Sequence, residues 1–198
     1  TAIGGIDYNV LPGTVIVPSS VGSASAIVNL NGIIDDNLVE IDETVTLTII
    51  GVSNEGGFGA PTISASQASA TATLSDDDIG TFTITTLDAD AAEETPLTAV
   101  GEAEFRIDLD KENATGTPLT LTYDLDGDDP GGNPDYNIGG DPLTFPAGVT
   151  FRTLRILPID DTEVEDDEAV IITLEDPSSG LFEIGTPDSG TAIIADND

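Results

Sequence analysis

The sequence contains no cysteine, histidine, methionine or tryptophan. Without thiol and imidazole groups it cannot form disulfides, use Cys–His catalysis, or supply the nitrogen and sulfur ligands that hold zinc, copper or iron. Only 4 Lys and Arg residues stand against 38 Asp and Glu, for a formal net charge of −34. A surface of that sign repels nucleic acid and anionic lipid, so neither is an expected partner. No run of 18 apolar residues occurs, so we expect no insertion into a membrane.

The apolar residues that are present alternate with polar ones. The segments with this pattern are "TFTITTL" (81–87), "AEFRIDL" (103–109), "LTLTYDL" (119–125), "AVIITL" (169–174) and "TAIIA" (191–195). Each is rich in β-branched or aromatic residues at a period of two and is bounded by turn-forming residues. The pattern predicts an all-β chain of short strands in a sandwich. Four phenylalanines lie at expected strand positions, and we expect them to form the core (Phe82, Phe105, Phe145 and Phe151).

An internal repeat runs through the chain. The triplet "IDD" occurs at 34–36 and again, 125 residues later, at 159–161. Glu43 and Glu168 have the same separation, "DYN" occurs at 7–9 and 135–137, and "ATATLSDDD" (70–78) matches "GTAIIADND" (190–198). Landmarks in the same order indicate a duplication.

The repeat predicts two tandem immunoglobulin-like antiparallel β-sandwiches, over residues 1–78 and 79–198. The second copy has 56 residues before Asp135, whereas only six precede Asp7. We therefore expect copy one to hold only the C-terminal part of a repeat. Its first strands either precede Thr1 or come from another segment or subunit by strand addition. The abrupt start of the sequence is typical of a chain excerpted or processed from a longer one.

The acidic residues of copy one are concentrated rather than scattered. Copy one has ten acids and no Lys or Arg, and eight of those acids lie inside the repeated landmarks. Two carboxylates about 5 Å apart repel by roughly 3 kcal/mol at an effective dielectric near 20. Gathered at one end of a sandwich, eight would cost more than a small domain's stability of about 5–15 kcal/mol. Oxygen ligands without nitrogen or sulfur favour Ca²⁺ over Mg²⁺, and a cluster this large predicts more than one ion.

Other interpretations of the polar residues remain open. The acids could be solvated loop residues or an adaptation to high salt, and the wider spread of acids in copy two favours that interpretation there. The segment "DLDGDDPGGNPD" (124–135) is either a polar insertion or an accessory Ca²⁺ site, since it lacks the distal Glu of an EF-hand loop. Asn113-Ala114-Thr115 is a glycosylation sequon in an expected turn.

The landmarks together resemble the Calx-β repeat, a family first described in the regulatory loop of sodium–calcium exchangers and also found in large surface and adhesion proteins. They comprise a "DY" after a glycine-rich loop, an "IxDDxxxExDE" segment and a terminal "DxD". This resemblance implies a seven-stranded immunoglobulin-like sandwich that binds Ca²⁺ through loops at one end. It also implies which residues are ligands. In copy one they are Asp7, Asp35, Asp36, Glu40, Glu43, Asp76, Asp77 and Asp78. In copy two they are Asp135, Asp160, Asp161, Glu165, Glu168, Asp196 and Asp198, joined by Glu94 or Glu93.

Two functions follow as expectations. The leading one is a Ca²⁺-stiffened structural module of an extracellular surface protein, adhesin stalk or filament, whose partners are neighbouring repeats or subunits. The alternative is a Ca²⁺-sensing regulatory module of a membrane transporter or signalling protein. We expect no enzymatic activity, because no nucleophile–base pair is present and the aromatic content is too low for a sugar cleft.

Overall fold

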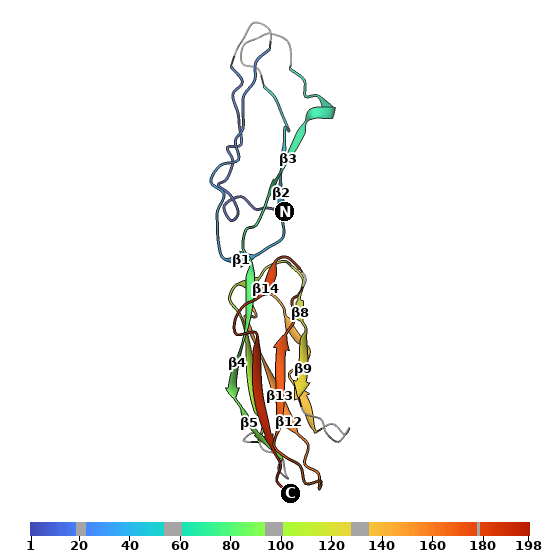
Figure 1. Ribbon diagram of the computed structural model, residues 1–198. Coiled ribbons are helices and arrows are strands. Elements are labelled where there is room, and N and C mark those ends of the chain that lie inside the picture. Colours follow the sequence, from blue (N-terminus) through green and yellow to red (C-terminus); the bar gives the residue numbers. More distant parts are fainter. Residues whose placement is uncertain (19–22, 54–60, 94–100, 128–134, 178) are drawn as a thin grey trace. The chain divides into compact units, whose positions relative to one another are not determined.

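The computed structural model describes residues 1–18, 23–53, 61–93, 101–127, 135–177 and 179–198. The all-β prediction is confirmed, since the only helical element in these ranges is the three-residue 3₁₀ turn η1 (Ala65–Gln67). The chain forms two compact units (Figure 1). Unit 1 comprises residues 1–36 and 41–76, and unit 2 comprises residues 37–40 and 77–198. Within the described ranges, no helix has the length and apolar character needed to cross a membrane.

Unit 2 is a β-sandwich (Figure 1). Its larger sheet has the strand order β10-β12-β6-β4-β14, antiparallel except for β14 against β4. These strands are β4 (Gly80–Asp88), β6 (Ala103–Leu109), β10 (Tyr136–Gly139), β12 (Phe151–Pro158) and β14 (Phe182–Ile184). The facing sheet has the order β5-β15-β13-β9, in which β5 runs parallel to β15. Its strands are β5 (Asp90–Ala92), β9 (Tyr123–Gly127), β13 (Glu168–Leu174) and β15 (Ser189–Ala195).

The predicted alternation explains which side chains fill the sandwich. In β6 the residues Ala103, Phe105, Ile107 and Leu109 are buried, and the polar residues between them are half-buried. β13 follows the same pattern. Phe82, Phe105 and Phe145 are fully buried, as predicted, and the Phe82 and Phe145 rings pack edge to face with centroids 4.9 Å apart. The prediction for Phe151 is wrong. It is 50% exposed, and its ring packs under the Arg106 guanidinium on the outer face of the sheet.

Two short strand pairs complete unit 2. β8 (Leu119–Leu121) pairs antiparallel with β11 (Leu143–Phe145). β1 (Leu38–Val39) pairs parallel with β7 (Glu112–Asn113), and the Ala114 amide donates to the Val39 carbonyl at 2.8 Å. Val39 has no exposed surface and belongs to the hydrophobic core of unit 2. The four residues 37–40 therefore complete unit 2, although they lie far from the rest of it in sequence.

Asn113 stabilises the same end of the sandwich. Only 1% of it is exposed, and its side-chain amide donates to the carbonyls of Thr117 and Phe145, each at 3.0 Å. Its side-chain oxygen accepts from the Thr115 hydroxyl at 2.7 Å. A buried amide with these bonds is a structural residue, and it cannot serve as the glycan acceptor of the sequon.

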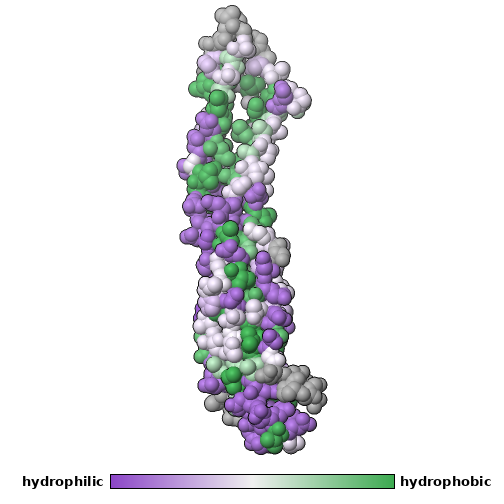
Figure 2. Space-filling view, viewed as in Figure 1, coloured by the Kyte–Doolittle hydropathy of each residue, from purple (hydrophilic) through white to green (hydrophobic). Residues whose placement is uncertain are grey.

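The described residues of unit 1 form one two-stranded antiparallel sheet, β2 (Glu43–Thr48) with β3 (Ser69–Leu74). Val45 is its buried strand residue, while many other apolar side chains of this unit are exposed, including Val10, Ile16, Ile27 and Ile50. Figure 2 shows apolar residues in green over the surface of this unit.

The two units share local geometry at the repeated landmarks. In unit 1 the Ile34 amide donates to the Asp7 carbonyl at 3.0 Å; in unit 2 the Ile159 amide donates to the Asp135 carbonyl at 2.8 Å. Glu43 pairs with Leu74 in β2–β3, and Glu168 pairs with Ile194 in β13–β15. These are the residue pairs that the sequence repeat makes equivalent, so the equivalent strands have the same register.

Val39 and Val164 offer a matched test of burial. Val39→Ala removes two methyl groups from a sealed core and should destabilise unit 2 by about 1.5–3 kcal/mol. Val164 lies 125 residues later and is 81% exposed, so Val164→Ala should change the free energy of unfolding by less than about 0.5 kcal/mol. Urea unfolding followed by Tyr123 and Tyr136 fluorescence, in a Tyr8→Phe background, measures both. Equal effects would show that Val39 is not part of this core.

Candidate metal centre

The inward-facing rows of the sandwich end in carboxylates. In β13 every second residue is buried, namely Leu174, Ile172, Val170 and Glu168. Glu168 is the first residue of the strand and is only 5% exposed. The β15 row of Ala192 and Ile194 continues in the same way to Asp196. Because side chains alternate along a strand, these acids project toward the space between the sheets at the end of the core.

The first cluster consists of Asp135, Glu165 and Glu168. One carboxylate oxygen from each residue lies within 4.8 Å of the other two. Asp135 immediately precedes β10 and is 7% exposed, Glu168 opens β13, and Glu165 lies in the loop between β12 and β13. The Glu165 amide donates to the Asp196 carboxylate at 2.9 Å, which holds this loop against the end of β15.

The second cluster consists of Glu93, Asp196 and Asp198, again with ligand atoms within 4.8 Å of one another. Glu93 follows β5 and is 6% exposed, and its amide donates to the Ala195 carbonyl at 3.1 Å. The Asn197 side chain donates to the Glu93 carbonyl and to the Asp160 carboxylate. Both clusters therefore lie at the end of unit 2 where β5, β12 and β15 finish, and Figure 2 shows hydrophilic residues gathered around that end.

The pKa values report excess negative charge at this end. Burial raises the pKa of Glu93 to about 7, and repulsion from Asp161, Asp196, Glu165 and Asp160 adds to the shift. The pKa of Glu165 is raised by desolvation and then by Asp135, Asp161, Glu163 and Asp196. The pKa of Asp196 is instead lowered, mainly by the hydrogen bond from the Glu165 amide. In each cluster, therefore, the pKa of one residue is raised by a carboxylate of the other cluster.

All seven acids predicted for copy two therefore lie at this one end. Asp160 and Asp161 belong to neither triplet. They follow β12 directly, and the Asp161 carboxylate accepts the Glu163 amide at 2.7 Å. Of the two candidates before the second strand, Glu94 lies outside the described residues. Glu93 is the one in the cluster, because it continues the row of the buried Ala91 at a period of two. The alternation of side chains along β5 could therefore have identified Glu93 from the sequence alone.

The acids predicted for copy one are divided between the two units. Asp7, Asp35, Asp36, Glu43 and Asp76 belong to unit 1, whereas Glu40, Asp77 and Asp78 belong to unit 2. Among the described residues, neither set contains a triplet as closely spaced as the two above. The Asp78 carboxylate accepts a hydrogen bond from the Lys111 ammonium at 2.6 Å, so the cation partner of this acid comes from copy two.

The donor set fits a hard divalent cation. Both triplets consist of carboxylates alone, and each contains a buried member. The basic side chains have other partners: Arg106 pairs with Asp108, Lys111 with Asp78 and Arg155 with Glu102 and Glu104, while Arg152 donates to the Thr144 carbonyl. Ca²⁺ binds oxygen ligands of this kind and would favour the ionised form of Glu93.

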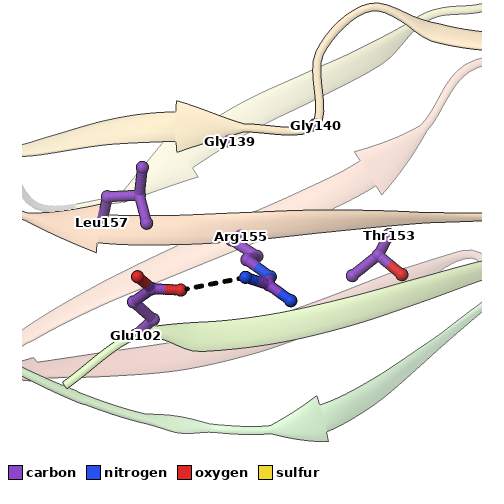
Figure 3. A pocket seen from close by; sticks show the side chains of 6 residues that line it. All are labelled: Glu102, Gly139, Gly140, Thr153, Arg155 and Leu157. Atoms are coloured by element: carbon purple, nitrogen blue, oxygen red, sulfur yellow. Dashed lines mark hydrogen bonds and ion pairs between the residues drawn. The ribbon is translucent and has the colours of Figure 1, made fainter. Parts of the chain in front are cut away.

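Two other candidate places lie outside the two clusters. Asp124 and Asp126 lie on β9, and the part of the 124–135 segment from 128 to 134 lies outside the described residues. A shallow pocket on the larger sheet is lined by Glu102, Gly139, Gly140, Thr153, Arg155 and Leu157 (Figure 3). Its two charged side chains pair with each other at 3.4 Å, so they neutralise one another.

Comparison with known proteins decides the family. Residues 76–198 match the Calx-beta domain. The chain belongs to the Calx-beta domain family. Sodium/calcium exchanger 1 of Canis lupus familiaris is 30% identical over 193 residues, which cover 89% of this chain and 19% of the exchanger. Adhesion G-protein coupled receptor V1 of Danio rerio is 27% identical over 183 residues, which cover 88% of this chain and 3% of the receptor. The chain thus spans a fifth or less of these relatives.

Solved structures similar to this chain include calcium-binding domains of Calx. The apo-form Calx CBD1 domain is 26% identical, with a TM-score of 0.42, over 59% of this chain and 98% of that domain. The calcium-binding domain CBD12 of CALX1.1 is 28% identical, with a TM-score of 0.41, over 60% of this chain and 44% of that structure. Calx-beta domains are Ca²⁺-binding modules, and the two acidic triplets of unit 2 lie within the residues that match the family.

Glu168→Gln tests the first cluster without changing side-chain volume. We expect Ca²⁺ affinity, measured by isothermal titration calorimetry, to fall about tenfold or more, because one anionic ligand is lost. The metal-free protein should melt at a higher temperature than the wild type, since one buried negative charge has been removed. Glu183→Gln on β14 removes the same charge from an exposed position away from both clusters, and it is the matched control. Equal affinities for the two variants would exclude Glu168 as a ligand.

Proposed function

We propose that the chain is a Ca²⁺-binding structural module of a large extracellular surface protein, adhesin stalk or filament. The observation that carries the proposal is the pair of carboxylate triplets at one end of unit 2, each with a buried acid. More than one Ca²⁺ ion would bind there. Bound ions would remove the repulsion among the loops and hold them rigid, so that neighbouring repeats keep a fixed angle.

The extracellular role requires only weak Ca²⁺ sites. Extracellular modules bind Ca²⁺ with dissociation constants of about 10⁻⁴–10⁻³ M, and the ion would keep such sites filled by mass action. Neighbouring repeats or subunits of the same kind are the proposed partners. The tandem arrangement, with copy one over 1–78 and copy two over 79–198, is part of the proposal. It is supported by the equal registers of β2–β3 and β13–β15.

A second candidate function is a Ca²⁺-sensing regulatory module of a membrane protein. The likeness to sodium/calcium exchanger 1, which extends over 89% of this chain, favours it. A sensor would bind Ca²⁺ with dissociation constants of about 10⁻⁷–10⁻⁵ M, so affinity separates the two functions. Saturation of chelator-stripped protein only near millimolar Ca²⁺ would support the structural role, and saturation in the micromolar range would support the sensor.

Thermal unfolding tests the Ca²⁺-binding function that both candidates share. At 5 mM ion, Ca²⁺ should raise the melting temperature of unit 2 well above its value in chelator, because the ion binds the folded state alone. Mg²⁺ should raise it less, since it demands octahedral geometry and keeps its water. Equal melting temperatures in Ca²⁺ and in chelator would contradict the proposal.

We also propose that additional strands cover unit 1 in the assembled protein. Its two-stranded sheet leaves apolar side chains exposed, with Ile16 at 87%, Ile27 at 80% and Ile50 at 95%. A two-stranded sheet is marginally stable alone. Strands of the same protein or of another subunit, added beside the two-stranded sheet, would bury these side chains.

Native mass spectrometry and hydrogen exchange test this covering. The chain should associate as its concentration rises, and the amides of β2 and β3 should become more protected in the associated form. Slow exchange of both strands in a strictly monomeric sample would contradict the need for added strands.

A further inference from the structure

Val39 shows how unit 2 accepts an apolar side chain at one end. β6 begins beside the end of β12 that leads into the clusters, because Ala103 pairs with Ile156, and it runs away from them to Leu109. β7 follows β6, so the place where Val39 packs lies at the opposite end of the sandwich from the clusters. We call this place the valine seat. It is formed by β7 and Ala114, whose amide donates to the Val39 carbonyl.

Val164 is the counterpart of Val39 in the repeat. "IDDNLVEIDE" (34–43) and "IDDTEVEDDE" (159–168) align without a gap, which places Val164 125 residues after Val39. Both ends of this alignment have structural support. Ile34 and Ile159 make the same main-chain hydrogen bond, and Glu43 and Glu168 occupy the same register position.

The environments of the two valines are opposite. Val39 has no exposed surface, whereas Val164 is 81% exposed in a loop of acids. The loop is nevertheless held on both sides of Val164. The Glu163 amide donates to Asp161 at 2.7 Å, and the Glu165 amide donates to Asp196 at 2.9 Å. An isolated exposed valine needs no explanation, but one whose repeat counterpart is fully buried in a sandwich does.

We propose that Val164 is the docking residue for a further Calx-beta sandwich, which takes it into a valine seat as unit 2 takes Val39. The partner is a sandwich of this kind with an empty seat, following in the same protein or belonging to another subunit. Because the seat and the Val164 loop lie at opposite ends of unit 2, the contact repeats head to tail. The inference rests on the tandem repeat in the proposed function and does not require that Ca²⁺ binds.

Single thiols provide the test, since the chain has no cysteine. In the 198-residue chain, Val39→Cys should react slowly with a maleimide, and Val164→Cys should react as fast as the loop control Thr162→Cys. A longer chain is then made by adding a second copy of residues 79–198 after Asp198, which reproduces the Asp78–Ile79 junction. There, labelling of Val164→Cys should slow about tenfold or more, because it becomes available only on local opening. Thr162→Cys should change less than about twofold, as expected for a position that stays exposed.

Unchanged labelling of Val164→Cys in the longer chain, with the added sandwich folded by circular dichroism, would overturn the proposal. If the added sandwich fails to fold, the full chain carrying Val39→Asp supplies an empty seat in trans. Excess Val39→Asp chain should then slow the labelling of Val164→Cys, whereas excess wild-type chain, with its seat filled, should not. Equal rates in the two mixtures reject docking. Running each comparison in Ca²⁺ and in chelator separates the failure of docking from the failure of Ca²⁺ binding.

Discussion

Repulsion among the carboxylates at one end of unit 2 determines what that end of the molecule requires, which is a counterion. The inward rows that build the core end in Glu168, Asp196 and Glu93, so the acids are carried to the end of the core by the strands themselves. The basic side chains have partners elsewhere. Burial and the neighbouring carboxylates together raise the pKa of Glu93 to about 7. A divalent cation bound by oxygen ligands is the simplest counterion for such a site.

The apolar core and the acidic clusters occupy different parts of the sandwich. Its middle is sealed by fully buried phenylalanine, isoleucine and leucine residues, which position the strand ends independently of any ion. The segments that carry Glu165 and Asp198 extend beyond that core, and the amides of both residues donate to the Asp196 carboxylate. We therefore expect metal to act on the loops and on whatever packs against them more than on the core itself.

The strands and most of the site could be predicted from the sequence, because both depend on short-range patterns. Alternation along 103–109 and 169–174 defines β6 and β13, and the spacing of the repeated acids brings copy two's candidates to one end. Long-range relations could not be predicted in this way. Nothing local shows that Val39 completes unit 2, that Asn113 is buried by bonds to Thr117 and Phe145, or that Phe151 packs outward under Arg106. Asp78 shows the same limit, since its cation partner Lys111 comes from the other copy.

The most direct measurement is a diffraction map of crystals grown with millimolar Ca²⁺ and collected at a wavelength where calcium scatters anomalously. The account predicts anomalous peaks coordinated by Asp135, Glu165 and Glu168, and by Glu93, Asp196 and Asp198. Well-ordered loops without such peaks, or carboxylates splayed apart in the presence of the ion, would contradict it.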